Sequence, residues 1–352
     1  MNVDELRKVV SLGRPIYQEK IIGDLSGIDL SQSVLVEINF DKAVIGSCSF
    51  ENSALSRCDL NGHDLSNAKL KGAVFGDCSL RGVNLCEAEL DRTAFINSDM
   101  TDSNLSKTKL SSITVAGCEL ESSNWNSSSL QDSAITESNV GSASFEKINW
   151  QNFSMSEVDL RSCAWSPVIV AKGLMLKCDF SGLDLAHSRY VNCSFNESTW
   201  QKTNCVDASM VQCLFISCVF REVDFSRAEL TGSIFSGASL SVVDFSKALL
   251  QTSNFDSSNC QGVVFDYTDL SQTRFVGAKI RNTNFIGARL IQSDFSNSLL
   301  TNIRLDDASL QHSNWHNVSH DLAGDELENR GTMGTDPARL DAELSLKRSE
   351  AA

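Results

Sequence analysis

The sequence predicts a repeat fold built from five-residue sides, four of which make one coil. The first observation is an apolar residue at every fifth position from Leu25 to Trp315, a run of 59 positions without a slip. The second observation is a recurrence of residue type every twenty positions within that run. A period of five fits neither the 3.6-residue period of an amphipathic helix nor the two-residue period of a strand, so ordinary amphipathic elements are excluded.

Each five-residue unit has the same plan around its apolar centre. The residue two positions before the centre is mostly small, as at Ala43 and Cys48, and the residue just before it is often Asp or Asn, as at Asp24. Such a carboxyl or amide can hydrogen-bond the backbone of a turn. This A/S/C-D/N-L/F-x-x unit resembles the pentapeptide-repeat family over residues 23–318. The resemblance implies an all-β fold, a right-handed quadrilateral (four-sided) parallel β-helix with one pentapeptide on each side.

The twenty-residue recurrence supports four sides independently, because like residues stack best on like residues when coils lie one strand spacing apart. About fifteen coils follow from the length of the repeat at twenty residues a coil. The small residues also point inward, so the interior should be full and should hold no ligand channel. The expected columns are Phe195, Phe215, Phe235, Phe255, Phe275 and Phe295; Leu230, Leu250, Leu270, Leu290 and Leu310; and Phe225, Phe245, Phe265 and Phe285.

The elements follow in chain order. Residues 1–22 lie outside the register and are expected to form an N-terminal cap, helical because Leu6, Val9 and Val10 share one helical face. Residues 23–318 form the β-helix. Its weakest repeats run from 150 to 176, where Asp and Asn disappear and Pro and Gly enter, which indicates a bulge or outward loop that keeps the five-residue phase.

The last segment, residues 319–352, is expected to be a linker followed by a short helix or a disordered tail. Asp336 and Pro337 suit the first positions of that helix, which would carry Leu340 and Leu344. Such a helix could cover the last coil, join two molecules into a homodimer through the C-terminal end, or bind another protein.

Two groups of residues are candidates for partner binding. Trp150 and Trp165 crowd the same coils near Phe153, and a ring displaced outward would form a patch with Pro167 and Lys172. The alternative is that these aromatic residues only over-pack a local coil. Leu340 and Leu344 are the second group of candidates.

The cysteines suggest packing more than chemistry. Nine of the twelve occupy the small inward position, Cys205 and Cys260 occupy apolar centres, and only Cys86 points outward. Neighbouring pairs such as Cys58 with Cys78 would lie on adjacent coils, close enough for a disulfide under oxidising conditions.

No C-x-x-C pair, phosphate loop or nucleophile motif occurs. His312, His316 and His320 lie four residues apart, but successive pentapeptides point to different sides of a coil. No metal, cofactor, small-molecule substrate or enzymatic activity is therefore expected.

Composition limits the partner. A formal net charge of −15 disfavours direct nucleic-acid binding, and no stretch is apolar enough to suggest a membrane span. The first residues lack a secretory signal, so a bacterial cytoplasmic location is expected, with signal-less export left open. We therefore expect a non-enzymatic interaction scaffold for a protein partner. By resemblance, three narrower roles remain: a type VI secretion accessory protein, a DNA-mimicking protein that binds DNA gyrase, and an effector delivered into a host cell.

Overall fold

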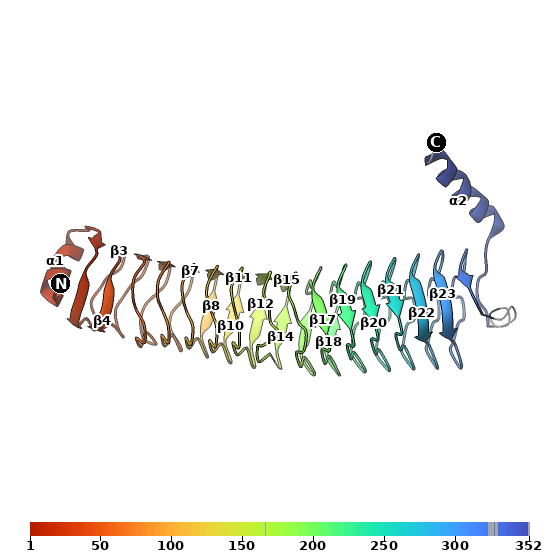
Figure 1. The fold of residues 1–352 in the computed structure, drawn as a ribbon, viewed down its shortest axis with the longest axis horizontal. Coiled ribbons are helices and arrows are strands. Elements are labelled where there is room, and N and C mark those ends of the chain that lie inside the picture. Colours follow the sequence, from red (N-terminus) through yellow and green to blue (C-terminus); the bar gives the residue numbers. More distant parts are fainter. Residues whose placement is uncertain (166, 323–326, 328–329, 351–352) are drawn as a thin grey trace. The chain divides into compact units, whose positions relative to one another are not determined.

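The computed structural model describes residues 1–165, 167–322, 327 and 330–350, and it divides into two compact units, residues 1–183 and 184–352. In both units short parallel strands stack as successive coils of a β-solenoid (Figure 1), and together the units hold about fifteen coils. The predicted all-β parallel solenoid is thereby confirmed. Among the described residues, no helix has the length and apolar character needed to cross a bilayer.

The first unit begins with a helix and continues in three strand ladders. A nine-stranded parallel sheet has the order β1-β3-β5-β6-β7-β9-β11-β13-β15, a second ladder pairs β8, β10, β12 and β14, and β2 pairs with β4. The elements are α1 (Val3–Ser11), β1 (Ile16–Tyr17), β2 (Lys20–Asp24), β3 (Val34–Val36), β4 (Asn39–Val44), β5 (Ala54–Ser56), β6 (Val74–Gly76), β7 (Ala94–Ile96), β8 (Lys109–Ser111), β9 (Thr114–Ala116), β10 (Ser129–Gln131), β11 (Ala134–Thr136), β12 (Asn149–Gln151), β13 (Ser154–Ser156), β14 (Ile169–Ala171) and β15 (Leu174–Leu176).

The second unit contains a seven-stranded parallel sheet of order β17-β19-β20-β21-β22-β23-β24, a pairing of β16 with β18, and a C-terminal helix. Its elements are β16 (Arg189–Val191), β17 (Thr199–Gln201), β18 (Ser209–Val211), β19 (Val219–Arg221), β20 (Ser239–Ser241), β21 (Asn259–Gln261), β22 (Lys279–Asn284), β23 (Leu299–Arg304), β24 (Ser319–His320) and α2 (Pro337–Glu350).

A turn at each corner limits the length of each side of a coil. At the corner after Leu250, the N–H of Ser253 donates to the Leu250 carbonyl at 3.1 Å, and Thr252 between them has φ 58°. A positive φ at the third turn residue defines a type II turn. The Asp or Asn before each centre supports the next corner, as where Asp269 Oδ1 accepts from the Ser271 N–H at 3.0 Å. These side-chain bonds confirm the turn role inferred from the repeat.

The core consists of the predicted columns. Every fifth residue from Leu25 to Trp315 is buried. In the second unit the rings of Phe215, Phe235 and Phe255 stack nearly parallel with centroids 4.8 and 4.7 Å apart. A second column, Phe225 to Phe285, stacks with centroids 5.1 to 5.2 Å apart. These spacings match the strand separation, so side chains and backbone repeat with one period.

The expected bulge or outward loop at 150–176 is not found in the described residues. β12 pairs with β14 and β13 pairs with β15, each with partners twenty residues apart, so the ladders continue without an insertion. The bulky inward Phe153 is accommodated by Gly173, which lies twenty residues later in the next coil. A Cβ on Gly173 would lie 2.8 Å from Phe153 Cε1, so only glycine leaves room for that ring.

The solenoid extends beyond residues 23–318 at both ends. Ile16 pairs with Leu35 and Asn314 bridges to Met333, both nineteen residues apart instead of twenty. One residue fewer in each terminal coil breaks the five-residue register while the backbone pairing continues. α1 packs on β2, and its Leu6 is fully buried.

Candidate interaction surface

The two tryptophans expected to form an outward patch point into the core. Trp150 is 0% exposed and Trp165 is 3% exposed. Their ring centroids lie 5.6 Å apart, and Phe153 lies 4.9 Å from Trp150. The partner-binding role predicted for Trp150 and Trp165 is therefore wrong, because both occupy apolar centres that the regular coil turns inward. Their rings pack against each other and against Phe153 inside the coils.

The other four candidate residues do not form one site. Pro167 and Lys172 are exposed on the first unit. Leu340 is half-buried and Leu344 is 42% exposed, and both belong to α2 in the second unit.

Polar contacts hold the start of α2. The Asp336 N–H donates to His316 Nδ1 at 3.2 Å, and His316 Nε2 lies 3.4 Å from Glu343 Oε2. Arg339 and then His316 hold the pKa of Glu343 below its usual value. These contacts account for His316 as a structural residue of the C-terminal segment.

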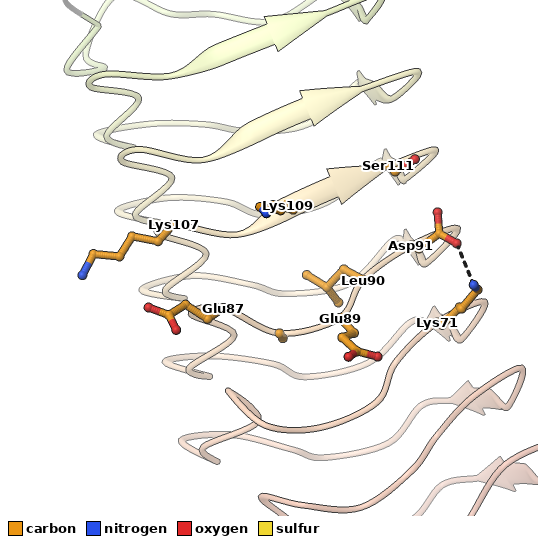
Figure 2. A pocket seen from close by; sticks show the side chains of 9 residues that line it. Lys71, Glu87, Glu89, Leu90, Asp91, Lys107, Lys109 and Ser111 are labelled. Atoms are coloured by element: carbon orange, nitrogen blue, oxygen red, sulfur yellow. Dashed lines mark ion pairs between the residues drawn. The ribbon is translucent and has the colours of Figure 1, made fainter.

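A charged groove of about 690 Å³ lies on the first unit. Lys71 pairs with Asp91 at 3.3 Å on one side of it, and Lys107 and Glu87 lie on the other side (Figure 2). Leu90, Lys109 and Ser111 also line the groove. The numbers of acidic and basic residues that line the groove are equal.

The same unit carries a long surface that has no charged side chain. It consists of the outward residues of the eight strands from β3 to β15 in the nine-stranded sheet, and we call it the uncharged face. The centres of these strands are buried, so the residues on either side of each centre point outward. The uncharged face comprises Val34, Val36, Ala54, Ser56, Val74, Gly76, Ala94, Ile96, Thr114, Ala116, Ala134, Thr136, Ser154, Ser156, Leu174 and Leu176.

Apolar side chains on this face are open to solvent. Val34, Val74, Ile96 and Leu174 are 41, 39, 39 and 50% exposed. A shallow depression of about 320 Å³ lies along one edge, lined by Thr114, Ala134, Ser154 and Leu174 among others. These side chains lie on β3, β6, β7 and β15, whereas β9, β11 and β13 present Thr, Ser and Ala. Exposed apolar surface can mark an interaction site in a protein.

The corners that border the uncharged face are charged. Glu37 pairs with Arg57 at 2.8 Å beside β3 and β5, and Glu157 pairs with Lys177 at 3.8 Å beside β13 and β15. Depletion of charged residues at the centre, with a polar rim around it, is a feature of protein interfaces. Neither the composition nor the five-residue unit reveals this face, because neither separates the outward positions by side of the coil. Sorting the outward positions by side of the coil would have separated the uncharged column.

The described residues contain no cluster of three or more His, Cys, Asp or Glu side chains that could hold a metal ion. The cysteines are free thiols, and all but Cys86 are buried. Burial raises the pKa of Cys163 and Cys260 to about 12 and that of Cys178 to about 11. Thiols with such pKa values stay protonated and unreactive at neutral pH.

Fold and surface together define a β-solenoid repeat protein that presents extended flat sides. The family described as Pentapeptide repeat region matches residues 48–125 and 208–285, and the family described as Pentapeptide repeats (8 copies) matches residues 24–62. These matches cover about half of the sequence, and the chain belongs to the pentapeptide-repeat family. Proteins of this family are generally structural or interaction proteins without enzymatic activity.

Several solved structures are similar to this chain. HetL, a pentapeptide repeat protein involved in heterocyst differentiation regulation from the cyanobacterium Nostoc sp. strain PCC 7120, is 19% identical, with 89% of this chain and 96% of that chain covered and a TM-score of 0.22. Full-length QnrB1, a plasmid-mediated fluoroquinolone resistance protein, is 19% identical, with 58% and 98% covered and a TM-score of 0.27. At these scores the likenesses support no statement about function. No curated protein matches the chain in sequence.

Proposed function

We propose that this protein is a non-enzymatic scaffold that binds protein through the uncharged face of its first unit. The observation that carries the proposal is the row of sixteen outward positions from Val34 to Leu176 without a charge. In a chain in which 21% of residues are charged, such a row leaves apolar side chains in water unless another surface covers them. The regular coils hold these side chains in fixed positions, so binding requires little ordering of the chain.

The test is capture of partners by the tagged full-length protein from a lysate of its source organism, identified by mass spectrometry. Ile96→Arg places a charge in the middle of the face and should abolish specific capture. Ile169→Arg is the matched control, because Ile169 is also an exposed outward strand residue, 51% exposed, but lies on β14 outside the face. Equal capture by wild type and both variants would contradict the proposal. A secretion-system partner would be one specific case of a positive result.

A second candidate is binding to DNA gyrase by mimicry of DNA. One outward column of the first unit is acidic and comprises Asp59, Asp99, Glu119, Asp159 and Asp179. Arginines interrupt it, however, with Arg81 3.0 Å from Asp99 and Arg161 2.6 Å from Asp159. The pairs break the negative stripe that a mimic needs, so this role ranks below the scaffold. Inhibition of purified gyrase in a supercoiling assay, lost in Glu119→Lys, would establish it.

A further inference from the structure

We propose that the uncharged face packs against the same face of a second copy of this chain. In this dimer the coils of the two copies stack in opposite directions, and we call the arrangement antiparallel. This inference rests on the proposed function and names its partner. The face consists of uncharged residues, and neighbouring strands pair with partners twenty residues apart, so the corners beside the face recur at the same interval. Two such sheets can pack face to face at about 10 Å, as in β-sandwiches.

The area of the face suits a dimer. Eight strands at about 4.8 Å and a side of about five residues give a footprint of roughly 600 Å². A standard-size interface buries about 800 Å² on each partner. Corner residues that border the face can supply the difference, and their charges therefore determine how the two copies are oriented.

The corner charges are complementary under one arrangement. A two-fold axis parallel to the strands, between β7 and β9, places β3 opposite the second copy's β15 and β5 opposite its β13. Glu37 then faces Lys177, and Arg57 faces Glu157. Because Glu37 already pairs with Arg57 and Glu157 with Lys177 within one chain, the four groups would form a square of alternating charge at each end of the interface.

The competing arrangement is less favourable. A two-fold axis along the direction of coil stacking would place each coil opposite the equivalent coil of the second copy. Lys172 would then face Lys177, and Asp132 would face Glu137, with no opposite charges facing each other. The antiparallel arrangement has one like-charged contact, between Asp77 and Glu137, against its two opposite-charged ones. Counting these corners favours antiparallel coils.

The first test is the molar mass of the full-length protein by light scattering and sedimentation equilibrium from about 1 to 200 μM. A rise from the 38.5 kDa monomer to twice that mass is expected. Ile96→Arg should raise the dissociation constant at least tenfold, whereas Ile169→Arg should change it less than twofold. Circular dichroism of each variant verifies that the solenoid remains folded.

The second test examines orientation. Arg57→Glu alone should weaken the dimer severalfold at low salt, because two acidic groups would then face each other. Adding Glu157→Arg should restore the affinity, although residues 57 and 157 lie five coils apart within one chain. Failure of the double variant to restore it would overturn the antiparallel arrangement.

The outcomes separate this inference from the proposed function. A monomer at all concentrations overturns the second-copy inference, while loss of protein capture in Ile96→Arg would still support the scaffold. A dimer that is abolished by removing residues 337–350 but unaffected by Ile96→Arg would place the interface at the C-terminal end and overturn the inference. A dimer that is disrupted by Ile96→Arg supports it.

Discussion

A single residue pair shows how strongly position in the repeat determines the cost of a mutation. Leu249 and Leu250 are adjacent, yet Leu249 is 44% exposed and Leu250 is fully buried between the coils. Leu250→Ala should cost about 2–5 kcal/mol because it leaves a cavity in the column. Leu249→Ala should change the free energy of unfolding by about 0.5 kcal/mol or less. Urea midpoints measure both variants, and equal shifts would show that the inward register is wrong.

At the same scale, the Asx turns make the fold sensitive to acid. Hydrogen bonds from the Ser66 N–H and hydroxyl, and from the Asn84 amide, hold the pKa of Asp64 below its ordinary value. A depressed pKa stabilises the fold above the unfolded-state pKa of about 3.9, and this stabilisation is lost as pH falls through the lower folded value.

Asp64→Asn should lower stability at pH 7 less than Asp64→Ala does, because an amide oxygen can accept the same backbone hydrogen bond but lacks the charge. The decline in urea midpoint between pH 5 and pH 3 should become shallower than in wild type. Asp64→Ala removes the acceptor, so it should lower stability at pH 7 by about 1 kcal/mol. If Asp64→Asn destabilises at pH 7 as much as Asp64→Ala, the charge and not the turn bond is what matters.

At the scale of elements, the sequence predicts the strands better than their ends and surfaces. The buried centres and the Asx turns follow from residue type, so the coils could be predicted throughout. The left-handed backbone conformation of some corner residues could not be predicted from residue type. Val242 and Tyr267 adopt φ values of 55° and 57°, which their side chains do not favour. The close approach of Gly173 to Phe153 could not be predicted either, because it is a contact between residues of two coils.

Helix α1 protects the first coil. Asn2 and Glu5 form a reciprocal capping box at its start, with hydrogen bonds of 3.0 and 2.9 Å, and Leu6 anchors it. The helix packs on β2, an edge strand whose partner is β4, and an uncovered edge strand can pair with other chains. Leu6→Asp should release the helix and increase concentration-dependent light scattering. Leu12→Asp, at a 57% exposed position, is the control and should leave scattering at the wild-type level.

On the scale of the whole molecule, the candidate site was harder to predict than the fold. Trp150 and Trp165 are conspicuous in the sequence, but large rings at apolar centres fill the interior. The uncharged face consists of inconspicuous residues such as Ala54 and Ser156, and its meaning comes from their alignment over eight coils. The residue type at each position of the repeat thus determines the fold. A binding surface depends instead on which outward residues of neighbouring coils lie side by side.

The twenty-residue period can be tested by deletion. Removing residues 241–260 takes out one whole coil, so Leu240 is followed by Gln261 and every column above stays aligned with the columns below. Removing residues 246–250 keeps the five-residue phase but rotates all later columns by one side, so Phe255 would stack on Leu230 and the Phe columns would be broken. The shorter deletion should lower the urea midpoint more than the longer one, although it removes fewer residues. A midpoint for the five-residue deletion equal to or above that of the twenty-residue deletion would mean that apolar phase alone stabilises the solenoid, and that stacking of like residues contributes nothing.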